Sequence, residues 1–444
     1  MGIYFGTDGL RGKVNDDLSF DISYKVGNAI GAMLPGAKVL IGRDTRKTGD
    51  LIALGVSGGL VNAGANVTDV GICPTAGIAY LTKAKGFDYG VVISASHNSA
   101  EFNGIKVFDS SGKKVGDKME TAIEKKFLHE VAVKYTKIGS YTYAPRVAIA
   151  YEEFLSNSIS TSLKGKTIIL DCANGASYKV APAVFRDHGA KIIATNCKPD
   201  GFNINEKCGS LHIQKLQKYV LKYKADMGFS FDGDSDRVLA VDDKGNVVDG
   251  DKLIYLLAKE YQKMGKLGQP IVVGTRHTNM GVEKALNNLG IEMLRTDIGD
   301  KYVSQKLEEK GLLIGGEQSG HVFIKDYLQT GDGVLNALVI SELITKNNIK
   351  LSEYFDFDLY AQTNINVKVQ DKIRVINNEK LNIAVEEQED ILGKDARIMV
   401  RLSGTEPYVR VMVECKNKQE ADESAQKIKD VIEELNREFD ECVE

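Results

Sequence analysis

Short apolar runs and amphipathic segments alternate through most of the chain. Three times, a short apolar run is followed by a polar loop, a helical pattern, a glycine and a second apolar run, at 38–70, 166–193 and 270–293. This order is typical of a βαβ unit, in which two parallel strands are joined by a right-handed helical crossover. The repetition predicts three related α/β domains in series.

The pattern changes near Gln362. Short strands are predicted at 364–369, 397–402 and 408–414, and a long helix follows Asn417. The apolar residues of that helix recur at alternating spacings of four and three, which places them on one face: Ala421, Ala425, Ile428, Ile432, Leu435 and Phe439. These elements predict a fourth domain of α+β type. We expect the four domains to cover 1–152, 153–252, 253–365 and 366–444.

Composition narrows the class of protein. The chain has 444 residues, 43% hydrophobic content and a net charge of −4, as in ordinary globular proteins. No basic patch argues for nucleic acid, and no apolar run is long enough to span a membrane. The N-terminal residues do not form a secretory signal, and the six cysteines form no C-x-x-C pair. We therefore expect a cytoplasmic protein with reduced thiols; a homodimer stays open.

The apolar run at 91–93 ends in small polar residues, Ser94-Ala95-Ser96-His97-Asn98. Open α/β sheets bind ligands at the carboxyl ends of their strands, so Ser96 and His97 are placed for chemistry. Because Ser, His and Asn are also ordinary turn residues, this loop gains weight only together with the other loops below.

A second loop, Asp232-Gly233-Asp234-Ser235-Asp236-Arg237, joins the predicted strands at 227–231 and 238–241. Alternate residues can point three carboxylates at one place, where their mutual repulsion favours a bound divalent cation, Mg²⁺ or Ca²⁺. An EF-hand is excluded because Arg237 stands where its glycine is required and because the flanking segments are strands.

Two further loops carry polar groups between glycines. In Gly315-Gly316-Glu317-Gln318-Ser319-Gly320-His321, Glu317 and Ser319 suit sugar hydroxyls and His321 suits proton transfer. In the second loop, two arginines flank hydroxyls and a glycine N–H, a pattern typical of an anion site. Its residues are Arg401, Ser403, Gly404, Thr405 and Arg410.

Two basic residues complete the candidates. Arg11 lies in Thr7-Asp8-Gly9-Leu10-Arg11-Gly12, where the glycines permit close approach to a ligand, and it could bind phosphate through two hydrogen bonds. Lys106 follows Ser96 by ten residues and is close to it in sequence.

Taken together and in order, these loops resemble those of the α-D-phosphohexomutase superfamily, and within it the phosphoglucosamine mutases. The resemblance covers essentially the whole chain. It implies four domains around one cleft, a phosphoserine at Ser96, a Mg²⁺ held by Ser96, Asp232, Asp234 and Asp236, and a sugar loop at Glu317 and Ser319.

The implied activity is that of an isomerase, an intramolecular phosphotransferase. Phosphoserine would pass its phosphoryl group to glucosamine 6-phosphate, and the resulting hexosamine 1,6-bisphosphate would turn over and return its 6-phosphate, giving glucosamine 1-phosphate for amino-sugar and peptidoglycan precursors. Arg401, Ser403, Gly404, Thr405 and Arg410 would hold the phosphate that is not reacting. Arg237 would contact the substrate; Lys106, Arg11 and His321 are unranked candidates for charge stabilisation and proton transfer, with His97 beside the nucleophile.

Other functions stay open. A phosphoglucomutase or phosphomannomutase would share these loops, a phosphatase would release the Ser96 phosphate to water, and a sugar-phosphate sensor would bind without turnover. Three positions depart from the family pattern, namely Ser99, Lys301 and Leu211. None of these departures removes a reacting group.

Overall fold

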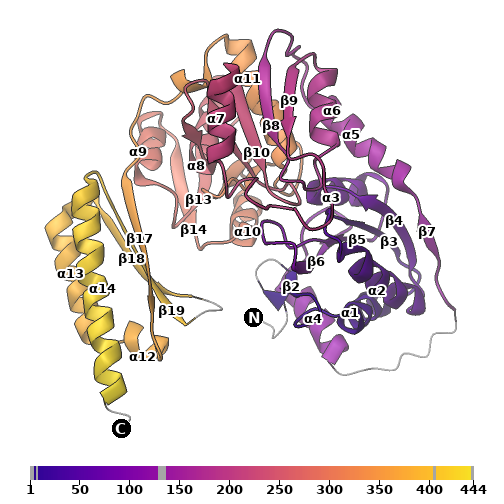
Figure 1. The fold of residues 1–444 in the computed structure, drawn as a ribbon, viewed down its shortest axis with the longest axis horizontal. Coiled ribbons are helices and arrows are strands. Elements are labelled where there is room, and N and C mark those ends of the chain that lie inside the picture. Colours follow the sequence, from indigo (N-terminus) through magenta and orange to yellow (C-terminus); the bar gives the residue numbers. More distant parts are fainter. Residues whose placement is uncertain (1–4, 7–8, 129–136, 404–406, 442–444) are drawn as a thin grey trace. The chain divides into compact units, whose positions relative to one another are not determined.

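The computed structural model describes residues 5–6, 9–128, 137–403 and 407–441. Some residues named above lie outside this description: Thr7-Asp8, Gly404 and Thr405. For Phe439, the side chain is not described. The chain forms two compact units. The first comprises Met1–Thr278 and Leu286–Asp356, and the second comprises Asn279–Ala285 and Phe357–Glu444. Each unit is described by itself (Figure 1).

The first unit begins with a mixed seven-stranded sheet in the order β1-β2-β6-β5-β3-β4-β7. The predicted parallel pairing of β3 with β4 is confirmed, and β5 pairs with β3 in the same direction. The strands are β1 (Phe5–Gly6), β2 (Gly9–Lys13), β3 (Lys38–Arg43), β4 (Asn66–Ile72), β5 (Tyr89–Ile93), β6 (Phe102–Asp109) and β7 (Tyr141–Tyr143). The helices are α1 (Phe20–Met33), α2 (Gly49–Asn62), α3 (Thr75–Ala84), α4 (Asp117–Leu128) and α5 (Ile149–Ser156).

The second sheet has the order β12-β11-β10-β8-β9, and the predicted parallel pair β8 and β9 is confirmed. Strand β10 is buried along its whole length and leads directly into the acidic loop at 232–236. The elements are β8 (Thr167–Asp171), α6 (Val180–Asp187), β9 (Lys191–Thr195), α7 (Gln214–Tyr223), β10 (Met227–Phe231), β11 (Val238–Asp242) and β12 (Val247–Val248).

The third sheet has the order β14-β13-β15-β16, again with the predicted parallel pair, here β13 and β14. Its elements are α8 (Gly250–Lys263), β13 (Ile271–Thr275), α9 (Met280–Asn288), β14 (Glu292–Thr296), α10 (Asp300–Lys310), β15 (Ile314–Gly316), β16 (Val322–Ile324) and α11 (Gly333–Asn347). The expected glycine loop at 315–321 is shorter than predicted, because Gly315 and Gly316 belong to β15 and pair with β16.

The second unit holds an antiparallel sheet of order β17-β19-β18. Figure 1 shows α13 and α14 running side by side along this sheet. The apolar face of α14 is buried, as predicted, from Ala421 to Leu435. The elements are β17 (Ala361–Lys368), α12 (Lys372–Ile376), α13 (Glu379–Leu392), β18 (Arg397–Leu402), β19 (Tyr408–Cys415) and α14 (Lys418–Glu441).

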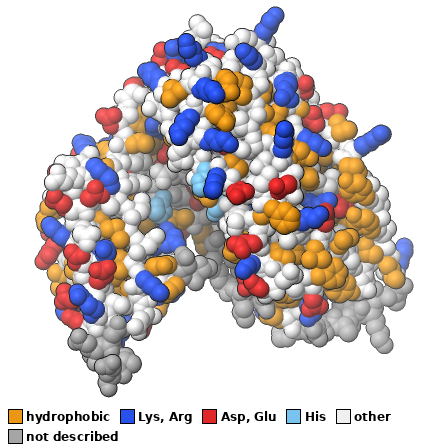
Figure 2. All heavy atoms as spheres, viewed as in Figure 1, with side chains coloured by type: hydrophobic (Ala, Val, Ile, Leu, Met, Phe, Trp, Pro, Cys, Tyr) orange, Lys and Arg blue, Asp and Glu red, His pale blue; other side chains and the backbone are white. Residues whose placement is uncertain are grey.

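The predicted fold class, three α/β domains followed by an α+β domain, is confirmed. The exact domain boundaries stay a prediction. Within the described residues, no helix is both long and apolar enough to cross a membrane. Figure 2 shows basic and acidic side chains interspersed over the visible described surface.

Candidate active site

Ser96 lies just beyond the end of β5, is fully buried and has a left-handed backbone (φ 52°). A non-glycine residue in this conformation costs about 1–2 kcal/mol, so surrounding contacts must hold it there. Its Oγ donates a hydrogen bond to Asp232 Oδ2 at 2.6 Å. The predicted nucleophile and the predicted metal loop therefore meet, although they lie in different sheets.

Arg46 holds the backbone around Ser96. Its guanidinium donates to the carbonyl oxygens of Ser96 (3.0 Å) and Asn98 (2.8 Å), and also to those of Ser99 and Phe102. Both side chains of its ion pair with Asp44, at 2.9 Å, are fully buried. Removing one member of such a buried ion pair strongly destabilises a protein, because the remaining charge is left without its partner.

Ser94 and Asn205 also hold the loop that contains Ser96. Asp44 accepts from Ser94 Oγ at 2.6 Å, and Ser94 Oγ in turn accepts from the Ser96 N–H at 2.9 Å. Asn205, on a loop of the second sheet, donates to both Ser96 O and Asn98 O at 2.9 Å. Ser96 is thus fixed by side chains that come from two sheets.

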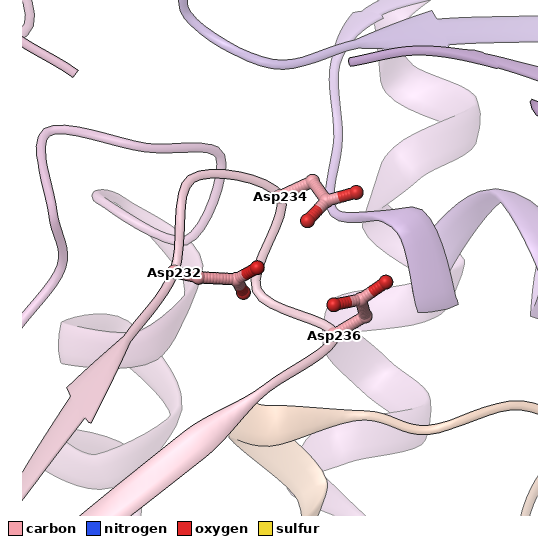
Figure 3. Close-up of side chains that lie close together, drawn as sticks. All are labelled: Asp232, Asp234 and Asp236. Carbon is pink, nitrogen blue, oxygen red and sulfur yellow. The ribbon is translucent and has the colours of Figure 1, made fainter. Parts of the chain in front are cut away.

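Three carboxylates gather on the loop between β10 and β11, and Figure 3 shows them turned toward one another. Asp232, Asp234 and Asp236 are buried, and one oxygen from each lies within 4.8 Å of the others. Gly233 makes the close approach to the serine loop possible, because a Cβ there would come 2.5 Å from Ser96 O. The predicted convergence of three carboxylates is confirmed.

Cationic and titratable side chains lie beside this cluster. Lys106 Nζ donates to Asp234 Oδ2 (2.7 Å) and Asp236 Oδ2 (3.0 Å), and it is itself buried. Burial and the neighbouring Asp236 and Asp234 raise the pKa of Asp232 well above its ordinary value. Burial also opposes ionisation of Asp236, but the Lys106 ammonium and His321 hold its pKa well below the ordinary value.

The oxygens of this cluster fit a hard cation. Asp234 Oδ1 and Asp236 Oδ1 are buried and have no hydrogen-bond partner among the described residues. Buried carboxylate oxygens are normally paired, and several anionic oxygens at one point are the ligand set that Mg²⁺ prefers. The aspartate cluster is therefore a candidate metal site.

His97 and two arginines lie beside the serine. Arg237 Nη1 is 3.2 Å from His97 Nδ1. Burial, followed by the Arg237 and Arg11 charges, lowers the pKa of His97 to about 4, so this imidazole is neutral near pH 7. Arg11 lies on β2, opposite Gly104 of β6. Arg237 and Arg11 are cations that can attract an anion to this part of the site.

The segment 317–321 is a tight hairpin loop in which the Glu317 N–H donates to His321 O at 3.0 Å. Glu317 is buried, its Oε1 accepts from the Gly299 N–H at 2.9 Å, and burial raises its pKa. Ser319 is exposed. The hairpin therefore presents one buried carboxyl and one exposed hydroxyl.

The imidazole of His321 lies between two carboxylates, with Nδ1 3.6 Å from Asp236 Oδ1 and Nε2 3.8 Å from Asp300 Oδ2. Burial acts to lower its pKa, but Asp236 and Asp300 outweigh it and the pKa is raised. His321 thus connects the metal loop to the third sheet and can hold a proton there.

The predicted anion loop belongs to the second unit. Arg401 on β18 lies directly opposite Arg410 on β19, and Arg410 Nη2 donates to Ser403 Oγ at 3.3 Å. Burial and the neighbouring Arg410 lower the pKa of Arg401. Lys372 adds a third cation, donating to Ser403 O at 2.8 Å. This concentration of positive charge favours a bound anion.

Sequence reasoning missed several residues that support the site: Asp44, Arg46, Thr75, Asn205 and Lys372. Asp44 and Arg46 follow β3, which is parallel to β5, so their position at the same sheet edge was a usable signal. Thr75, which donates to Asp234 Oδ2 at 2.7 Å, and Asn205 reach the site through long-range contacts that no local pattern shows.

The three departures from the family pattern lie outside the aspartate cluster. Ser99 and Leu211 are exposed. Lys301 Nζ donates to Glu120 Oε2 at 3.0 Å and also bonds Asp117, so it connects α10 to α4. None of the three replaces a carboxylate of the aspartate cluster.

Comparison with known proteins shows the family of the chain. Four models of the phosphoglucomutase/phosphomannomutase family match in order: alpha/beta/alpha domain I at 2–134, domain II at 150–245, domain III at 249–360 and the C-terminal domain at 365–431. Phosphoglucosamine mutase from Clostridioides difficile (strain 630) is 42% identical, over 98% of this chain and 99% of that protein. The protein of the same name from Caldicellulosiruptor bescii is 41% identical over the same shares.

Solved structures share the fold at lower identity. A phosphoglucomutase/phosphomannomutase family protein from Burkholderia thailandensis matches with a TM-score of 0.82 and 22% identity, over 97% of this chain and 96% of that one. Aspergillus fumigatus N-acetylphosphoglucosamine mutase, solved with GlcNAc-6P and magnesium, matches with a TM-score of 0.68 and 17% identity, over 98% and 96%.

The fold and the four domain matches define a phosphohexomutase. With relatives 41 or 42% identical along nearly its whole length, the chain belongs to the phosphoglucosamine mutase family.

Proposed function

We propose that this chain interconverts glucosamine 6-phosphate and glucosamine 1-phosphate, with Ser96 as the phosphoryl carrier. The observation that carries the proposal is the 2.6 Å hydrogen bond from Ser96 Oγ to a buried cluster of three carboxylates, in a chain similar to phosphoglucosamine mutases over its full length. A serine held against a candidate metal site is what a phosphoserine enzyme needs.

In the first half-reaction, the bond between Ser96 Oγ and phosphorus breaks and a bond from phosphorus to the sugar O1 forms. The proton of the O1 hydroxyl leaves to a base, and the departing Ser96 oxygen takes up a proton. The product is a hexosamine 1,6-bisphosphate, which also serves as the activator that reloads the serine. After the sugar turns over, its 6-phosphate returns to Ser96 and the proton is given to O6, so the atoms balance over the cycle.

The carboxylates would hold one divalent cation, with Ser96 or its phosphate beside it. A bound Mg²⁺ supplies positive charge next to the transferring phosphoryl group. Lys106 keeps Asp234 and Asp236 in place and adds a fixed positive charge to the same region. Arg11 and Arg237, near the neutral His97, would attract the phosphate and orient it.

His321 suits the transfer of the sugar proton, because Asp236 and Asp300 favour its protonated form and a proton can be held on its ring. The Glu317 carboxyl and the Ser319 hydroxyl would bind ring hydroxyls. In the second unit, Arg401, Ser403, Arg410 and the adjacent Gly404 and Thr405 would hold the phosphate that is not reacting. A homodimer and a cytoplasmic location stay predictions.

The test incubates the purified protein with Mg²⁺, a trace of sugar bisphosphate and glucosamine 6-phosphate, and follows glucosamine 1-phosphate and free phosphate together. We expect isomer without phosphate release, and a higher kcat/KM for glucosamine phosphate than for glucose phosphate. Free phosphate as the main product would indicate a phosphatase instead. A preference for glucose or mannose phosphate would overturn the amino-sugar substrate and leave a mutase.

A further inference from the structure

Two cysteines meet at the carboxyl edge of the second sheet, outside the residues assigned above. Cys172 follows β8 and Cys197 follows β9, two neighbouring parallel strands. Beyond the strand ends the two segments stay paired, because the Cys172 N–H donates to Thr195 O (3.2 Å) and the Asn174 N–H donates to Asn196 O (2.7 Å). Cys197 Sγ lies 3.2 Å from the same Thr195 oxygen.

The two cysteines lie side by side and are not equivalent. The Cys172 N–H and the Cys197 thiol both donate to the same Thr195 oxygen, each at 3.2 Å. Cys172 is fully buried, whereas Cys197 is half-buried and within reach of a small solute. The neighbouring Cys172 lowers the pKa of Cys197 despite its burial, and the neighbouring Cys197 together with burial raises the pKa of Cys172. Thiolate reactivity therefore belongs to Cys197.

We propose that Cys172 and Cys197 are a site of oxidative modification, a dithiol that a small peroxide converts to a disulfide. The Cys197 thiolate attacks one peroxide oxygen, the O–O bond breaks, and Cys197 becomes a sulfenic acid while water leaves. The Cys172 sulfur then displaces the sulfenic hydroxyl, the S–S bond forms and a second water leaves. Two thiols and one hydrogen peroxide thus give one disulfide and two waters.

The loops around Cys172 and Cys197 contain three residues with a left-handed backbone conformation. Ala173, Asn174 and Asn196 all have positive φ values, of 53°, 49° and 51°. A disulfide requires the sulfurs to approach to about 2.05 Å. A disulfide here would add its own geometric demands to loops that already hold three residues in a disfavoured conformation.

Both loops touch the active site. After Cys172, the Ala176 N–H donates to Gly233 O at 2.8 Å, inside the aspartate loop. After Cys197, the chain runs to Asn205, which donates to Ser96 O. Closing the disulfide is therefore expected to displace the aspartate loop, the serine loop or both, and to lower turnover reversibly. This effect on turnover rests on the proposed function, whereas the formation of the disulfide does not.

The experiment exposes the full-length protein to a small excess of hydrogen peroxide and measures intact mass, then maps peptides without reduction. We expect a loss of about 2 Da, a peptide linking Cys172 to Cys197, and recovery of the original mass with dithiothreitol. Cys172→Ser should stop at a sulfenic acid on Cys197 that a cyclic dione traps. Cys197→Ser should leave Cys172 reduced, and Cys208→Ser, the matched control on the same sheet edge, should still form the disulfide.

A linkage to any other cysteine, or sulfenic acid on Cys172 in place of Cys197, would overturn the proposal. Unfolding of a variant is detected by its melting temperature, and in that case the peptide map of the unsubstituted protein decides alone. If the disulfide forms but no isomerisation is found even in the reduced protein, the proposed function fails and the dithiol stands. If reduced protein isomerises sugar phosphates and no disulfide forms, the dithiol fails and the function stands.

Discussion

Replacing Arg46 by lysine tests whether the buried guanidinium positions the reactive serine. Arg46 donates to Asp44 and to four backbone carbonyls of the segment that contains Ser96. Lysine keeps the positive charge but has three donors in place of five. Asn205 still donates to Ser96 O and Asn98 O, so the main loss is at two other carbonyls: Ser99 O keeps only the Phe102 N–H, and Phe102 O loses the guanidinium donor.

The magnitude follows from those two bonds. Each hydrogen bond from a charged donor contributes about 1.5–3 kcal/mol, so Arg46→Lys should destabilise the serine loop by roughly 3–6 kcal/mol before relaxation. If about half of this is expressed at the transition state, kcat falls by about 10- to 100-fold, since 1.4 kcal/mol is a factor of ten. KM should change little, because Arg46 is buried behind the loop.

The assay measures kcat, KM, melting temperature and the phosphorylated fraction of Ser96 by intact mass. Arg43→Lys is the matched control, because Arg43 ends β3 but pairs with Asp50 and Asp69. We expect Arg43→Lys to keep its kcat. A lower melting temperature for Arg46→Lys with an unchanged kcat would refute the positioning role and leave a structural one.

Three further predictions concern other parts of the chain. Asp234→Asn removes one charged ligand and should lower kcat at least 100-fold with the fold intact by circular dichroism; activity that survives both this change and a chelator would exclude the metal site. Arg410→Ala should raise KM for the sugar phosphate about 10-fold and let bisphosphate escape into solution, whereas Arg374→Ala, on the exposed side of α12, should do neither; equal KM values in all three proteins would exclude the clamp. Burial raises the pKa of Asp332 from 3.8 to about 6, so the folded protein keeps this proton while the unfolded chain loses it. The contribution of this raised pKa to the free energy of unfolding, about 3 kcal/mol, is full below pH 4 and is lost as the pH rises to about 6. The free energy of unfolding of Asp332→Asn, measured by urea titration, should therefore vary less over pH 4–7 than that of the unsubstituted protein. Identical pH dependence in the two proteins would contradict the assignment.

The sequence allowed prediction of the elements whose pattern is strong. Strand β10 and the acidic loop after it are found where a short, mostly apolar run and alternating aspartates predicted them. Helices α12 and α13 were missed, because between them they bury only Val375, Leu381 and Gln388 and so leave a weak hydrophobic pattern. Short helices of this kind depend on tertiary contacts rather than on local sequence.

The site could be predicted only as separate loops. Each loop had a recognisable composition, but the contacts that hold Ser96 come from positions 50 and 109 residues away in the sequence. No local periodicity encodes such pairs. The parallel pairing of β3 with β5 would have placed Arg46 near Ser96, whereas the contact with Asn205 depends on how the second sheet packs against the first.

The most direct test of the central claim follows one phosphoryl group through a single turnover. Enzyme labelled with radioactive phosphate at Ser96 is mixed with an excess of unlabelled glucosamine 6-phosphate and quenched at intervals. We predict that label leaves the protein and is found first in a hexosamine bisphosphate and then in glucosamine phosphate, at a rate no slower than kcat, and that Ser96→Ala takes up no label. Label that stays on the protein through many turnovers, or that leaves as free phosphate, would contradict the account.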